Sequence, residues 1–124
     1  MRIAVVLTGG LHPSGEIEVI PAYLGLLASL ARRHEVHAFA LRHLVEPRTY
    51  TLRGVTVHDL GRPSAPRGLG RVAQYRALVR TMRRTGPFDV VHGIWGDPAG
   101  VLAALAGRAL GWPSVVTCTS GEFV

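Results

Sequence analysis

The chain has 124 residues, of which 48% are hydrophobic and 18% are charged, a composition typical of one globular domain. It contains no run of about eighteen apolar residues, which argues against a transmembrane helix. The stretch MRIAVVLTGG reaches Gly-Gly after a few apolar residues, so we expect a strand there and no signal peptide. The formal charge is +6 and the sequence contains no lysine, so the basic surface is arginine and favours phosphates, nucleic acid or anionic lipid.

Strands and helices are predicted to alternate along the chain. Apolar runs rich in valine and isoleucine predict five strands, at residues 2–7, 35–41, 54–60, 88–94 and 114–119. Helical spacing of apolar residues predicts three helices, at residues 17–33, 69–84 and 98–110. Asp97 is the expected N-cap of the last helix, with Pro98 at its first position, and Gly111 is expected to end it.

This alternation predicts an α/β fold, namely a three-layer, doubly wound Rossmann-like domain with a mainly parallel sheet. Residues 42–53 are expected to form a loop, with at most a short strand, and residues 61–68 a surface linker. The expected strand order is 3-2-1-4-5, which places the switch point between the first and fourth strands. Ligands bind such folds outside the carboxyl ends of the strands at that point, so the two loops there form the candidate site.

The loop after the first strand is rich in glycine. Gly9 and Gly10, followed by Ser14 and Gly15, give backbone that a phosphate can approach closely. The alternative is that these glycines serve only turns that need a positive φ. The loop matches neither GxGxxG nor GxxxxGK[ST], and no acidic residue closes the second strand, so a dinucleotide oxidoreductase is a poor interpretation.

Two residues stand out in the loop after the fourth strand. His92 is expected to end that strand, either as a core histidine with a satisfied ring or as a hydrogen-bonding group that faces a ligand. Trp95 follows it and either packs on the sheet edge or flanks a sugar or base.

The remaining histidines and the single cysteine predict no metal site. The sequence HEVH at residues 34–37 lacks the spacing of a zinc motif, because His34 ends a helix whereas His37 lies within a strand, so the two rings should diverge. Cys118 lies in an apolar run and has no second cysteine to pair with, so we expect a buried thiol.

The predicted helix at residues 69–84 has two different faces. We expect its buried face to comprise Leu69, Val72, Ala73, Leu78, Val79 and Met82. Arg76, Arg80 and Arg83 recur on the other face as a basic stripe, which is either solvated or in contact with an anionic membrane or a phosphorylated acceptor. Neither a recognition helix nor interleaved aromatic residues accompany the stripe, so no nucleic acid partner is expected.

With these segments laid out, the chain resembles the N-terminal domain of glycosyltransferase family 4, the retaining sugar transferases with a GT-B fold. The match covers essentially the whole chain. The segments that follow the family's order are MRIAVV, the glycine loop, LARRHEVHAFAL, GVTVHDLG and FDVVHGIWGDPAGVLAALAGRALGWPSVVTCTSGEF. The most specific of them are LARRHEV and the last segment.

The resemblance implies a nucleotide-sugar-dependent transferase in which two Rossmann-like domains enclose a cleft. Ser14 and Gly15 fall where the family usually has Gly-Gly near the donor diphosphate. His92 falls on the first histidine of a common His-x-His, whose second position is Ile94 here, and is the expected catalytic residue. The expected substrate-binding residues are Gly9, Gly10, Ser14, Gly15, Trp95, Gly121 and Glu122.

By the same resemblance, residues 1–124 correspond to the acceptor-side N-terminal domain, and the donor-binding C-terminal domain is absent, so we expect the chain alone to be inactive. The nucleotide-sugar acts as a substrate, and neither a cofactor nor a metal is expected. Expected partners are an acceptor that the sequence leaves open, the missing C-terminal domain, an anionic membrane and a second copy of the chain. The expected location is the cytoplasm, with peripheral attachment to the inner membrane face as a variant. The alternative function is a free-standing Rossmann-like binding module that docks a partner protein or an anionic membrane.

Overall fold

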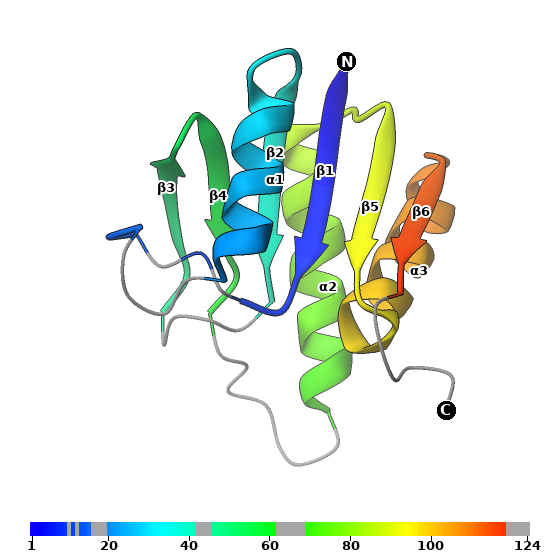
Figure 1. Cartoon of the computed structure of the whole chain (residues 1–124). Helices are drawn as coiled ribbons and strands as arrows, with labels where there is room; N and C mark the ends of the chain where they lie inside the picture. The colour runs from blue at the N-terminus through cyan, green and yellow to red at the C-terminus, as the bar shows by residue number, and fades with distance from the viewer. Residues whose placement is uncertain (10, 12, 16–19, 42–45, 62–68, 119–124) are drawn as a thin grey trace.

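A computed structural model describes residues 1–9, 11, 13–15, 20–41, 46–61 and 69–118. Within these ranges the chain forms a six-stranded sheet with helices on both faces, which confirms the predicted α/β class with a mainly parallel sheet (Figure 1). The strands are β1 (Arg2–Leu7), β2 (Glu35–Ala40), β3 (Arg48–Leu52), β4 (Val55–Asp59), β5 (Val90–Ile94) and β6 (Ser114–Thr117).

The strand order is β3-β4-β2-β1-β5-β6, which differs from the order predicted for a five-stranded sheet. The difference arises because β3 forms an edge strand, antiparallel to β4, where we expected a loop with at most a short strand. Arg53 and Gly54 join the two strands with φ angles of 52° and 82°, the paired positive values that a tight two-residue hairpin requires. The other five strands are parallel to their neighbours.

β1 lies at the centre of the sheet and is buried on both faces. Ile3 is level with Val36 of β2 on one side and with Val90 of β5 on the other. The uninterrupted apolar run of β1 supplies side chains for both faces, as a doubly covered parallel strand requires. The chain turns to one side after β1 and returns on the other side at β5, so the carboxyl ends of β1 and β5 flank the switch point.

Three α-helices cover the sheet in two layers. α1 (Pro21–Ala31) lies on one face, and α2 (Gly70–Thr85) and α3 (Val101–Leu110) lie on the other (Figure 1). Each face has its own apolar core. On the α1 side Leu24 and Leu27 pack with Val5, whereas on the opposite side Leu78 and Met82 pack with the core around β1 and β5.

The start of α3 differs from the prediction. A π-helical turn, η1 (Gly96–Gly100), precedes the helix, so Asp97 lies inside this turn and the prediction that it is the N-cap of α3 is wrong. The predicted end of the helix is confirmed, because Gly111 adopts the left-handed conformation with φ of 76° directly after Leu110.

The faces of α2 also differ from the prediction. Leu69 and Val72 are 53% and 48% exposed, so their assignment to the buried face is wrong. Residues three or four positions apart share a face of a helix. Val72 is four residues from Arg76, so it lies on the same exposed face as that arginine. Leu78 and Met82 are buried as predicted, and Gln74 and Thr81 are buried as well.

The last strand is exposed along its length. All four residues of β6 are exposed, because β6 is an edge strand with only β5 beside it. Cys118 follows β6 directly and is exposed, so the prediction of a buried thiol is wrong.

Arg2 joins three segments at the amino ends of the strands. Its guanidinium pairs with Glu35 of β2, with Nε and Oε2 3.1 Å apart. The same group donates to the carbonyl oxygens of Thr85 and Pro87 at 2.8 and 2.6 Å. The Arg2 backbone N–H donates to Asp89 at 2.7 Å, so one residue links β1, β2 and the connection into β5.

The salt bridge predicts how Glu35→Gln alters stability with pH. Hydrogen bonds from Arg2 and His37 lower the pKa of Glu35 from 4.5 to about 2. A carboxyl with a depressed pKa stabilises the fold above the unfolded-state pKa and loses this contribution as pH falls through the folded-state value. The stability advantage of wild type over Glu35→Gln should therefore be full above pH 4.5 and shrink toward pH 2, as measured by urea unfolding across that range. An advantage that does not change with pH would contradict this origin.

Candidate functional site

His92 lies in the middle of β5, on the sheet face that α1 partly covers. The strand continues to Ile94, so the prediction that His92 ends the strand is wrong by two residues. Its Nε2 lies 2.5 Å from the Thr117 hydroxyl oxygen on β6, which fixes the imidazole across the two strands. Burial lowers the pKa of His92, so the ring is neutral at neutral pH and offers both a donor and an acceptor.

Trp95 leaves β5 in an unusual backbone conformation. Its φ is 75°, a left-handed value that is costly for a bulky side chain. Its N–H donates to the Thr117 carbonyl at 2.8 Å, and its ring meets that of Tyr23 edge to face with 5.5 Å between centroids. A Cβ at Gly100 would overlap the Trp95 carbonyl, so the π-helical turn closes tightly on this residue. Backbone strain and π-helical turns concentrate at functional sites.

Thr8 and Gly9 directly follow β1, at the neighbouring carboxyl end. The Thr8 hydroxyl is buried and has no hydrogen-bond partner within the described part of the chain. A buried hydroxyl without a partner is uncommon and points to a missing ligand or water. Together with His92 and Trp95, it places polar groups on both sides of the switch point.

The described residues that follow in the glycine loop, Leu11 and Gly15, lie toward β3 and away from His92. Gly15 has a φ of 71°, which agrees with the alternative that a turn requires this glycine. A Cβ there would lie 3.2 Å from Leu52 Cδ1, so Gly15 lies beside β3. The Tyr50 hydroxyl donates to the Leu11 carbonyl and holds the loop over this edge. β4, β2 and β1 separate β3 from β5, so the expected hollow shared by Gly15 and His92 is not formed.

The other predicted site residues are distributed as follows. Ser14 precedes Gly15 and is exposed, on the same stretch of the loop. Gly10, Gly121 and Glu122 lie outside the described residues. Arg76, Arg80 and Arg83 belong to α2, which packs on the opposite face of the sheet, so the fold does not bring them together with His92.

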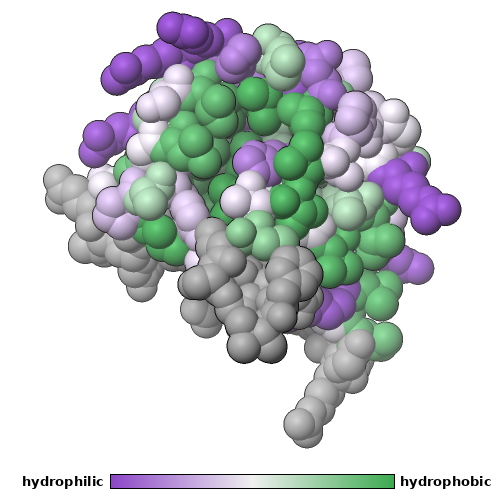
Figure 2. All heavy atoms as spheres, turned by 45° about the vertical axis from the view of Figure 1, so that its right-hand side comes forward, coloured by the Kyte–Doolittle hydropathy of each residue, from purple (hydrophilic) through white to green (hydrophobic). Residues whose placement is uncertain are grey.

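The surface around His92 is apolar and open. Val115 is level with His92 on β6 and is 55% exposed, and α1 contacts β2 and β4 instead of β6. Figure 2 shows the apolar surface on this side of the molecule, with a few hydrophilic groups enclosed by it. A neutral imidazole and an aromatic pair beside an apolar face suit a sugar ring, which offers hydroxyl groups at its edge and C–H groups on its face.

The histidines of HEVH diverge as predicted. His34 Nδ1 lies 3.2 Å from the amino terminus, whereas His37 Nδ1 lies 2.9 Å from Nε2 of His58 on β4. No cluster of three or more His, Cys, Asp or Glu side chains that could hold a metal ion occurs among the residues described.

Sequence reasoning missed two residues of this site, Thr117 and Tyr23. Both are distant from His92 in the sequence and reach it or Trp95 only through strand pairing and the packing of α1. The available signal for Thr117 was its place in the predicted last strand, one strand away from His92.

Comparison with known families accounts for most of the chain. The sequence model of the glycosyl transferase 4-like domain matches residues 19–123. This range includes α1, both strands that flank His92, and the π-helical turn. No curated protein matches the chain. None of the helices in the described ranges has the length and apolar character needed to cross a bilayer.

Proposed function

Because the chain belongs to the glycosyl transferase 4-like family, we propose that it is the acceptor-side half of a retaining, GT-B-type glycosyltransferase. Such an enzyme moves a sugar from a nucleotide-sugar donor to an acceptor. The observation that carries the proposal is that the family match, residues 19–123, includes His92 and Trp95 at the switch point.

In this proposal His92 binds a hydroxyl of the transferred sugar. Its hydrogen bond to Thr117 engages Nε2, which leaves Nδ1 as the ring nitrogen that can meet a ligand. Since burial keeps the ring neutral, its role is to orient the sugar by hydrogen bonding.

Trp95 and Tyr23 form the apolar wall of the proposed sugar site. The edge-to-face contact with Tyr23 and the hydrogen bond to Thr117 hold Trp95 in place, so little side-chain entropy is lost when a sugar packs on it. The Thr8 hydroxyl, which has no hydrogen-bond partner among the described residues, and the backbone at Gly9 directly follow β1 at the same end of the sheet.

The described residues that the proposal places at this site, namely Thr8, Gly9, Tyr23, His92, Trp95 and Thr117, include no cationic side chain for the donor diphosphate. Charge that develops on a departing diphosphate must be stabilised by cations or N–H donors placed around it. Gly15, which we expected to contribute, lies beside β3 instead. The proposal therefore assigns the nucleotide and diphosphate to a second domain, and the chain alone is inactive.

Complementation in trans tests this proposal. In isothermal titration the chain alone should bind UDP- and GDP-sugars weakly, whereas binding and sugar transfer should appear when a C-terminal half of a family enzyme is added. In the active mixture, His92→Ala should lower kcat/KM by about tenfold or more, the typical effect of losing a hydrogen bond to a ligand.

His34→Ala is the matched control, because His34 contacts the amino terminus at the opposite end of the sheet. The proposal fails if no complementing half restores turnover, or if His92→Ala and His34→Ala transfer sugar equally well.

A second function is favoured by one surface, the α2 stripe, defined as Leu69, Val72, Arg76, Arg80 and Arg83. All five residues are exposed and lie three or four positions apart, so they form one face. The sequence of α2 contains no acidic residue. An apolar and basic face of this kind suits attachment to an anionic bilayer, with each arginine near the surface adding about 1 kcal/mol.

Vesicle sedimentation tests this attachment. Vesicles that contain phosphatidylglycerol should bind the chain at low salt and release it at about 0.5 M NaCl, where charge interactions are screened. The triple variant R76Q/R80Q/R83Q should lose binding, and Val72→Ser should weaken it.

The control is R32Q/R33Q/R53Q, which removes the same charge from the end of α1 and the β3–β4 turn. If both triple variants lose binding equally, net charge is responsible and the α2 stripe is not a docking face.

A further inference from the structure

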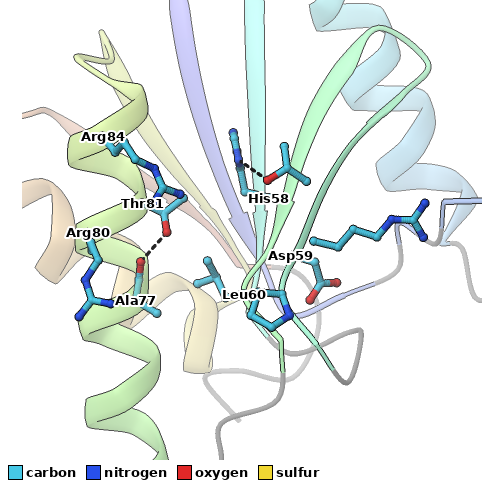
Figure 3. A pocket seen from close by; sticks show the side chains of 10 residues that line it. His58, Asp59, Leu60, Ala77, Arg80, Thr81 and Arg84 are labelled. Carbon is cyan, nitrogen blue, oxygen red and sulfur yellow. Dashed lines mark hydrogen bonds between the residues drawn. The ribbon is translucent and has the colours of Figure 1, made fainter.

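A cavity lies on the sheet face opposite α1, between α2 and the strands β3 and β4. It has a volume of about 330 Å³, and its polar lining includes Thr49, His58, Asp59, Arg80, Thr81 and Arg84 (Figure 3). β2 and β1 separate β4 from β5, and His92 lies on the other face, so this cavity is distinct from the proposed sugar site.

Two arginines give the cavity an unbalanced positive charge. Arg80 and Arg84 are one helical turn apart on α2, and Figure 3 shows Arg84 extending past Thr81 toward the strands. Between the described residues, ion pairs join Glu35 to Arg2 and to His37 and involve no arginine of α2. Like charges at this spacing destabilise a helix by a few tenths of a kcal/mol, and a bound anion would replace this repulsion by attraction.

The other charged lining residues do not cancel this charge. Asp59 shares its strand face with Val55 and Val57, which belong to the core on the α1 side, and its Oδ1 accepts the Gly61 N–H at 2.9 Å. The guanidinium of Arg48 lies over the Tyr50 ring, 5.6 Å from its centroid, so it is directed to that same side.

A chain of hydrogen bonds determines which atom His58 presents to the cavity. Nε2–H of His37 donates to Glu35 at 2.9 Å, and in the tautomer that carries its proton on Nε2 the other nitrogen, Nδ1, is an acceptor. His58 therefore donates its Nε2–H to His37 at 2.9 Å, and its Nδ1 carries a lone pair. This Nδ1 lies 3.4 Å from the Thr49 hydroxyl oxygen, at the cavity wall.

This arrangement distinguishes between kinds of anion. An acceptor nitrogen in a cavity lined by Arg80 and Arg84 suits an anion that also brings a proton. Hydrogen phosphate and the singly ionised phosphomonoester have a P–O–H group at mildly acidic pH, whereas sulfate and carboxylate do not. We infer that this cavity binds a phosphate group, with Arg84 and Arg80 pairing with its charge and His58 Nδ1 accepting a hydrogen bond from its P–O–H group in place of the Thr49 hydroxyl.

Titration calorimetry with inorganic phosphate at pH 6 tests the inference. Binding should be saturable, and sulfate should bind about tenfold more weakly because it brings no proton to His58. Arg84→Gln should weaken phosphate binding by about tenfold or more, which corresponds to losing a charge-assisted hydrogen bond.

Arg32→Gln is the matched control, because Arg32 is exposed at the end of α1 and does not line the cavity. It should change phosphate affinity by less than about twofold, the effect of one distant surface charge. Equal losses in Arg32→Gln and Arg84→Gln, equal affinities for sulfate and phosphate, or no saturable binding would each overturn the inference.

NMR titration measures the pKa of His58, which general charge attraction to the protein surface would not change. Burial, His37 and Arg84 lower the pKa of His58 to about 4. The neighbouring groups that face it are thus His37 on β2, with Glu35 behind it, and Arg84 on α2. A phosphate at Arg84 offsets this positive charge, so the pKa of His58 should rise when phosphate is bound. An unchanged His58 titration with phosphate bound would also overturn the inference.

Two further ligands distinguish a lipid headgroup from a soluble phosphomonoester as the source of the phosphate group. Glycerol 3-phosphate and monomeric dihexanoyl phosphatidic acid present the same phosphomonoester with and without acyl chains. Tighter binding of the lipid would identify a headgroup, which fits the exposed Leu69 and Val72 on the same helix. Equal affinities would identify a soluble phosphomonoester, and either result supports the phosphate site.

Discussion

The pairing of β1 with a parallel strand on each side is the constraint from which the rest of the structure follows. The register sets Ile3 level with both Val36 and Val90, so β1 must be apolar on both faces. After β1 the chain must therefore continue to β2 on one side of it and later return to β5 on the other side. The loops that follow β1 and β5 consequently lead in opposite directions from the switch point, near which His92, Trp95 and Thr8 are found.

The same sheet separates two kinds of chemistry onto its two faces. On the α1 face, a neutral imidazole and an aromatic pair adjoin an open apolar surface, which suits a sugar. On the α2 face, a cavity is lined by His58 and by arginines that have no carboxylate partner among the described residues. If both proposals hold, a sugar transfer site and a phosphate or lipid contact would occupy opposite sides of one domain.

The sequence predicted those features that depend on burial and local conformation. The apolar runs identified five strands and Gly111 identified the end of α3, because these signals are local. β3 was missed because its residues, RTYTL, are mostly polar and lie at an exposed edge of the sheet, so no apolar run marks the strand. The direction of the Gly15 loop was wrong because the Tyr50–Leu11 hydrogen bond that holds it connects residues far apart in sequence. The partners of His92 and Trp95 likewise depend on tertiary packing, so of the site only Gly9, His92 and Trp95 themselves were predicted.

The central claim is that ligands meet this domain at the carboxyl ends of β1 and β5. Amide chemical-shift mapping of the isotope-labelled chain, combined with a complementing C-terminal half and a nucleotide-sugar, tests it most directly. The account predicts that addition of the sugar donor shifts the amides of Thr8, Gly9, His92 and Trp95 most strongly. Largest shifts along α2 and β3, with those four amides unchanged, would contradict it.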